Sequence, residues 1–181
     1  MKRLILIAIV SLSASLLVCG QPEFPSGSPL FPEIGKWHEI SVDPQHAEAM
    51  RAVNQPKDQP FRFAIPVEVS LTPFNSGFIA TRGSETIWVL PVSSKGALSL
   101  NVILSPYNLP RGAYIYVYDH DRQIVRGAFT GESTSGTLSM PVMPVPGERL
   151  VLECHFPGTR IPENSVRSEE HTSELQSHLN L

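Results

Sequence analysis

The feature that most constrains the fold is a run of short alternating segments that begins at Phe61. From Phe61 to Leu71 apolar residues occupy every second position, as on one face of a β-strand. Similar segments follow at residues 77–82, 85–92, 97–104, 113–119, 123–129, 136–140 and 149–156. Turns rich in Pro, Gly and Ser separate them, and no helical period intervenes. The pattern predicts an all-β domain over residues 61–160, a two-sheet antiparallel sandwich of jelly-roll-like form.

Size and charge limit what such a domain can do. The chain has 181 residues, of which 41% are hydrophobic, enough for the core of one domain. Lys and Arg number 14 against 17 Asp and Glu, so the net charge of −3 provides no cationic surface for a phosphate backbone. Nucleic acid is therefore not an expected partner.

The first twenty residues are predicted to be a secretory signal peptide. Two basic residues precede an apolar run that reaches Val18, and cleavage after Gly20 would leave Gln21 at the new N-terminus. We therefore expect a secreted protein, periplasmic or extracellular, with no membrane contact after signal removal. Lipidation at Cys19 and a retained membrane anchor are the alternatives.

Prolines set the boundaries of the next part of the chain. Residues 21–60 are predicted to be a Pro-rich leader that is extended up to residue 42 and then forms one short helix. Asp43 suits the N-cap of this helix and Pro44 its first position, and Pro56 ends it by Asn54. Pro66 has no amide for a sheet, so its strand is expected at a sheet edge or beside a bulge.

Residues 161–181 are predicted to be a disordered tail of mostly artificial origin. The stretch RSEEHTSELQS at 167–177 matches, codon by codon, a translated sequencing-library adapter. We therefore expect the chain to be a truncated fragment whose native sequence after Val166 is missing. His171 and Glu174 have a spacing that could suit a metal on a helix, but they are excluded from function for the same reason.

The sequence predicts no catalytic residue, no metal site and no cofactor. Ser133 lies in a loop that lacks the second glycine of a nucleophile elbow, and the histidines lack the spacing of zinc ligands. The Asp119-His120-Asp121 turn offers oxygens to calcium, but no third acidic residue lies near it and hairpin-turn chemistry accounts for it. Cys154 falls on the apolar side of its strand and is expected to be buried, without a disulfide once the signal peptide is removed.

The candidate binding residues are three tyrosines on one strand face. Tyr114, Tyr116 and Tyr118 alternate with Ile115 and Val117. A row of phenol rings on an open sheet can stack on sugars or on the side chains of a partner. The alternative is that this face packs in the core beneath the second sheet.

Several segments together resemble a known protein family. They are FRFA at 61–64, WVLPVSSKGALSLN at 88–101, LPRGAYIYVYD at 109–119, VxGxFT at 125–130 and PGER at 146–149. In order and spacing they are similar to the N-terminal region of secreted lysyl-endopeptidase-like, trypsin-type serine proteases, over residues 40–160. In that family the region precedes a catalytic double barrel, and none of the positions that carry its catalytic residues exists in this sequence.

The resemblance implies a non-catalytic N-terminal or pro-region domain of an exported serine endopeptidase precursor. Such a domain would assist the folding of a downstream protease domain or mask its cleft, and that domain is the partner we expect. The alternative is a retained accessory β-sandwich that binds carbohydrate or protein through Tyr114, Tyr116 and Tyr118.

Overall fold

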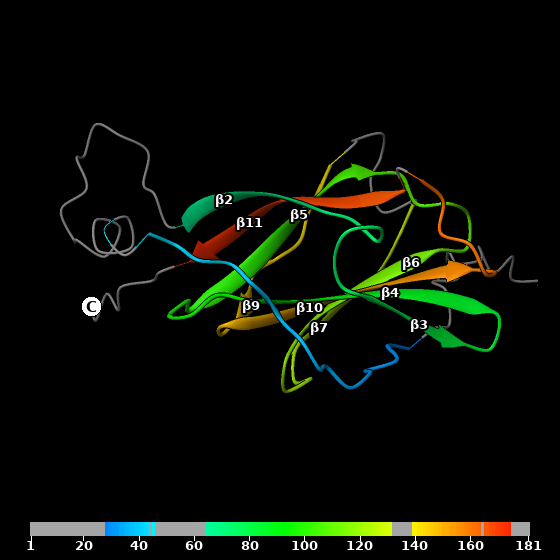
Figure 1. Cartoon of the computed structure of the whole chain (residues 1–181), viewed down its shortest axis with the longest axis horizontal. Helices are drawn as coiled ribbons and strands as arrows, with labels where there is room; N and C mark the ends of the chain where they lie inside the picture. The colour runs from blue at the N-terminus through cyan, green and yellow to red at the C-terminus, as the bar shows by residue number, and fades with distance from the viewer. Residues whose placement is uncertain (1–27, 44, 46–63, 132–138, 164, 175–181) are drawn as a thin grey trace, which may run out of the picture.

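Two sheets make up the fold (Figure 1). The structure, a computed structural model, describes residues 28–43, 45, 64–131, 139–163 and 165–174. The ordered elements of these residues are all β-strands. The chain is therefore mostly β, as the alternating pattern predicted.

Sheet A is the larger sheet, with six strands. Their order is β1 (His38–Glu39), β4 (Glu85–Ser93), β10 (Arg149–Pro157), β6 (Tyr114–Asp119) and β7 (Val125–Thr130), and β3 (Phe78–Arg82) also pairs with β4. Every pairing is antiparallel except that of β1 with β4.

Sheet B has five strands. Their order is β2 (Ala64–Leu71), β11 (Val166–Glu174), β5 (Ser99–Tyr107) and β8 (Met140–Pro141), and β9 (Val145–Pro146) also pairs with β5. Because β2 stands at the end of this order, Pro66 lies on an edge strand, and its predicted position is confirmed.

The antiparallel partners are nested along the chain. The innermost pair is β6 with β7, followed outward by β5 with β8 and β9, β4 with β10, and β2 with β11. Successive pairs alternate between sheet A and sheet B. The chain therefore passes repeatedly between the two layers that Figure 1 shows.

One hydrophobic core lies between the sheets. On β10, Leu150, Leu152, Cys154 and Phe156 belong to the same buried cluster as Leu100, Val102 and Leu104 of β5. The alternation of the sequence thus places the apolar side of each strand against the other sheet. Cys154 is completely buried, as predicted, and this burial raises the pKa of its thiol well above the usual value.

Most strand positions agree with the sequence pattern. All but one of the predicted segments coincide with strands of the structure to within a few residues. The exception is 136–140, which overlaps β8 at Met140 alone, and residues 132–138 lie outside the described part. The two-residue strands β1 and β9 were not predicted because they are too short to show a period.

The C-terminal segment differs from the prediction. A disordered tail was expected from residue 161, whereas Val166–Glu174 form β11 between β2 and β5. The backbone of β11 pairs with a strand on each side, and such pairing requires no apolar side chain. A search for hydrophobic alternation therefore could not find this strand.

Two N-terminal predictions lie wholly or mainly outside the described residues. The signal peptide at 1–20 is one, and the helix after Asp43 is the other. At the expected start of that helix, Asp43 Oδ1 accepts a hydrogen bond from the Gln45 amide at 2.9 Å, the contact that an N-cap makes. Within the part of the chain that the structure describes, no helix is long and apolar enough to cross a membrane.

Candidate functional site: a polar network beneath the N-terminal arm

The outer face of sheet A, which points away from sheet B, is covered by the first part of the chain's own N-terminal arm, residues 28–43, whereas Ile40 of this arm belongs to the core between the sheets. Figure 1 shows the blue part of this arm on the side of sheet A away from β2, β5 and β11, while the cyan part continues toward the end of the molecule where β2 and β11 are drawn. The face itself consists of Ile87 and Val89 from β4, Tyr114, Tyr116 and Tyr118 from β6, and Val151 from β10. Leu30, Phe31, Ile34 and Trp37 of the arm pack against it.

The three predicted binding residues are therefore not exposed. Tyr114, Tyr116 and Tyr118 share one face, as predicted, but their exposed fractions are 4%, 6% and 2%. The expected open aromatic row is wrong for this structure, and so is packing beneath the second sheet, because the covering layer is the arm. Ile115 and Val117, on the opposite face of β6, do face the core between the sheets.

Glu153 of β10 anchors the arm. Its side chain is completely buried beside Tyr118 and His155. Oε1 accepts a hydrogen bond from the Leu30 amide and lies 2.6 Å from His155 Nε2. Oε2 accepts from the Tyr118 hydroxyl at 2.7 Å and from the Phe31 amide at 3.3 Å. Both oxygens of a buried carboxylate are thus satisfied, which offsets the large cost of burying a charge.

These contacts determine the protonation of Glu153. Burial acts to raise the pKa of its carboxyl, but the hydrogen bonds from His155, the Leu30 amide and Tyr118 outweigh burial and hold the pKa below its usual value. Burial and the neighbouring Glu153 charge raise the pKa of Tyr118 far above the usual value, so this tyrosine stays a neutral donor. The carboxylate is therefore maintained as an acceptor at neutral pH.

A second carboxylate, Glu85 of β4, extends the network toward the surface. Glu85 Oε2 pairs with Arg82 at 3.0 Å and lies 3.5 Å from His155 Nδ1, while Glu85 Oε1 accepts from the Tyr114 hydroxyl at 2.8 Å. Arg82 also donates to the Tyr114 hydroxyl at 2.8 Å and to the backbone carbonyl of Ser28 at 2.7 Å. The network thus contacts the arm at Ser28 as well as at Glu153.

Tyr114 and His155 are the centre of this second half. Their rings stack with centroids 4.4 Å apart and an interplanar angle of 13°. Burial, followed by the hydrogen bond to Glu85, raises the pKa of Tyr114 to about 12. The pKa of Glu85 is lowered, because the hydrogen bonds from Tyr114 and Arg82 outweigh the effect of burial.

Two aromatic residues of the arm are held by cations, one in the turn between β6 and β7 and one on β10. The Arg122 guanidinium lies 5.1 Å from the centre of the Phe31 ring, which also meets Tyr118 edge-on at 4.9 Å. Likewise, Arg149 lies 5.2 Å from the centre of the Trp37 ring. Both distances are within the range of cation–π attraction.

In chemical terms, this site holds a peptide. Glu153 and Arg82 both bind backbone groups of the arm, and aromatic contacts hold two of its side chains. The nearest candidate nucleophile along β10, Cys154, is on the core side of the strand and its raised pKa keeps it a thiol. The arrangement fits binding of an extended chain better than it fits covalent catalysis.

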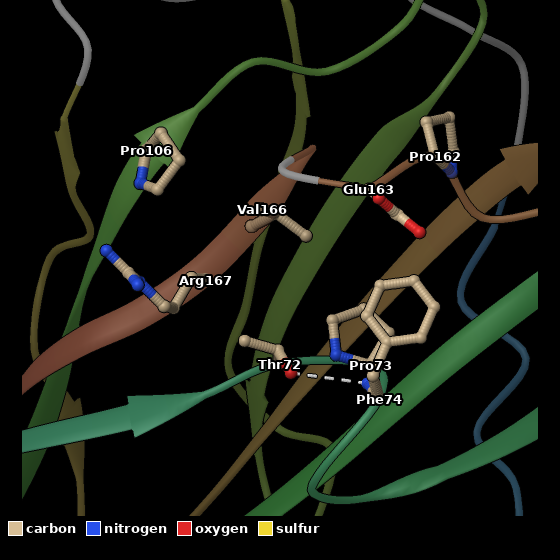
Figure 2. A pocket seen from close by; sticks show the side chains of 8 residues that line it. All are labelled: Thr72, Pro73, Phe74, Pro106, Pro162, Glu163, Val166 and Arg167. Carbon is tan, nitrogen blue, oxygen red and sulfur yellow. Dashed lines mark hydrogen bonds between the residues drawn. The ribbon is translucent and has the colours of Figure 1, made fainter.

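A pocket of about 360 Å³ lies at one end of sheet B (Figure 2). Its lining comes from the loop after β2, from β5 and from the approach to β11: Thr72, Pro73, Phe74, Pro106, Pro162, Glu163, Val166 and Arg167. In Figure 2, Glu163 and the Phe74 ring lie on one side and Arg167 on the other. With Phe74 65% exposed, this pocket is more open than the face beneath the arm.

The other residues considered from the sequence do not gather into a site. In the turn after β6, Asp119 Oδ1 accepts from the Ile124 amide at 2.6 Å, which is hairpin-turn chemistry. Among the described residues no group of three His, Cys, Asp or Glu side chains could hold a metal ion. His38 lies on β1, whereas Ser133 and His46 fall outside the described part.

Sequence reasoning missed Glu153 and Glu85. One signal was present: Glu153 and His155 occupy the second face of β10, whose first face is the apolar series ending at Phe156. Two ionisable residues on the second face of a central strand indicate either a solvent-exposed face or a satisfied polar network. The covering arm, which decides between these, is distant in the sequence.

A scan of protein-family models and a search of solved structures found no match for this chain.

Proposed function

We propose that this chain is the non-catalytic N-terminal or pro-region domain of an exported trypsin-type serine endopeptidase precursor. The observation that carries the proposal is the segment resemblance, and its motifs within the described residues fall on one folded unit. The motif at 88–101 begins in β4 and ends in β5, the motif at 109–119 contains β6, and PGER at 146–149 makes the turn between β9 and β10.

The use of the polar groups is consistent with a non-catalytic role. Glu153 and Glu85 each contact His155 and a tyrosine, and Glu153 also contacts the arm. A general base or nucleophile must instead reach a substrate atom. We therefore propose that this domain acts through its surface, by assisting the folding of a downstream protease domain or by masking its cleft. A partner that binds the native form stabilises it by mass action.

We further propose that the sandwich is a jelly roll. The nested pairing of β4 with β10, β5 with β8 and β9, and β6 with β7 supports this, as does its alternation between the sheets. A long antiparallel hairpin that is rolled into two layers gives this order of pairs. The proposal of export rests on the apolar N-terminal segment of the sequence.

A second candidate function is a retained accessory module that binds protein or carbohydrate. The row of Tyr114, Tyr116 and Tyr118 supports it, since the rings form a continuous aromatic surface on sheet A. This function requires the arm to leave that surface first.

The decisive experiment begins with the gene free of adapter sequence. The protease is expressed with and without residues 21–160, and the yield of active enzyme is measured. We expect the yield to fall strongly without this segment. Full activity without it, together with its persistence in the mature product, would favour the accessory module, and a downstream frame with no trypsin-like sequence would overturn the protease assignment.

A further inference from the structure

The contacts of the arm have the chemistry of peptide recognition. Glu153 accepts from two successive backbone amides, those of Leu30 and Phe31, although it lies 123 residues from Leu30 in the sequence. Backbone amides are common to all residues except proline. The carboxylate can therefore receive any segment whose backbone turns two adjacent amides toward it, as the arm does at Leu30 and Phe31.

Side-chain contacts add a preference to this backbone anchor. Phe31 is held between Tyr118 and Arg122. The next residue, Pro32, has no amide to satisfy, so a proline is suited to the position at which the pair of amides ends. The preferred occupant is thus an apolar residue, an aromatic residue and then a proline, with a further aromatic ring where Trp37 meets Arg149.

The face beneath the arm is more firmly built than the arm itself. Glu153, Tyr118 and Val151 are buried within a sheet, whereas Leu30, Phe31 and Trp37 are only partly buried. Phe31 also has a φ of 50°, a left-handed conformation that is costly for a residue with a side chain. The only regular pairing of the arm with the sheet is the two-residue strand β1.

We propose that the outer face of sheet A is a peptide-binding groove, which the arm fills in cis and from which a segment of a partner protein with the same backbone turn can displace it. The partner segment has the chemistry of residues 30–32, with two adjacent amides for Glu153, an aromatic ring for Tyr118 and Arg122, and a following proline. This inference does not depend on a downstream protease domain.

Competition with the arm sets the affinity that a partner experiences. A segment in trans binds only the fraction of molecules whose arm is open, so its apparent dissociation constant rises as that fraction falls. The arm is tethered to the groove and thus has a high effective concentration there. Weakening the arm without altering the groove should therefore strengthen binding in trans.

The test uses a fluorescein-labelled synthetic peptide of residues 28–40 and a chain that carries Phe31→Ala and Trp37→Ala. These substitutions remove contacts of the arm and leave the groove intact. In fluorescence anisotropy we expect the peptide to bind the doubly substituted chain at least about tenfold more tightly than the unaltered chain. The same peptide, N-methylated at the Leu30 and Phe31 amides, keeps the side chains but loses both donors to Glu153, and it should bind at least about tenfold more weakly.

Two results would overturn the proposal. The first concerns a doubly substituted chain that still unfolds cooperatively. If this chain binds the plain and the N-methylated peptides equally, or binds neither, the proposal fails. The other comes from hydrogen exchange on the unaltered chain, which also covers the case in which the substituted chain does not fold. Amides of residues 30–37 should exchange well before those of β10, and exchange only at the rate of global unfolding would show that the arm does not release.

Discussion

Glu153→Gln is the substitution that tests the polar network most directly. The carboxylate has two acceptor oxygens and receives donors on both: the Leu30 amide and His155 on one, the Phe31 amide and the Tyr118 hydroxyl on the other. Glutamine has nearly the same shape but retains one acceptor, and its NH₂ group would face two donors. The variant thus removes the negative charge and leaves some hydrogen-bond donors without an acceptor, with little change in side-chain volume.

The expected cost follows from these contacts. A buried donor without an acceptor costs about 1–3 kcal/mol, and two donors lose theirs here. We therefore expect the free energy of unfolding to fall by about 2–6 kcal/mol, the sum for two such donors. For a domain whose total stability is about 5–15 kcal/mol, this is a large fraction.

Urea unfolding followed by far-UV circular dichroism measures the effect. With a slope of about 1–3 kcal/mol per molar urea, the midpoint should move down by about 2 M. Glu148→Gln is the matched control, because Glu148 also accepts from a backbone amide, that of Gly96 at 2.7 Å, but is exposed to solvent. That substitution should cost less than about 1 kcal/mol. A midpoint for Glu153→Gln no lower than that of the control would refute the reasoning.

Three further outcomes are expected. The pKa values of Glu153 and Glu85 in the folded state lie below the usual 4.5. The stability that the two carboxylates provide is therefore complete above pH 4.5 and is lost as the pH falls through their folded-state pKa values. Urea midpoints that do not decrease from about pH 6 to about pH 3 would contradict this. Cys154 should react with a thiol reagent only as fast as the chain unfolds, which urea-dependent labelling measures, and rapid labelling of the native chain would contradict its burial. Gly77→Ala should lower the thermal midpoint more than Gly83→Ala. Both glycines have a positive φ, but only at Gly77 would an added Cβ collide with the neighbouring strand β4. Equal shifts of the midpoint would argue against that collision.

The strands could be predicted from the sequence because one physical effect dominates them. The alternation around Leu152 and Cys154 places each of these side chains in the core, since a sheet that packs against another has one apolar face. The same logic found the shared face of Tyr114, Tyr116 and Tyr118. It could not find what covers that face.

The cover and the last strand depend on long-range partners. Burial of the tyrosines results from contacts of the arm with Glu153, far away in the sequence, and a local period carries no information about them. Strand β11 is polar through most of its length and is held between β2 and β5 by backbone pairing. The origin of residues 167–177 stays a prediction from the codons, because backbone pairing does not depend on it.

The nested strand pairs have a consequence for how the chain assembles. The hairpin of β6 and β7 closes over a short turn, whereas β2 must wait for β11 from the opposite end of the described chain. Closing loops of increasing length delays the later pairs, so we expect the inner hairpin to form early and the outermost pair last. Until then β2 has no partner on either side, so another molecule can pair with it, and aggregation during refolding should begin there.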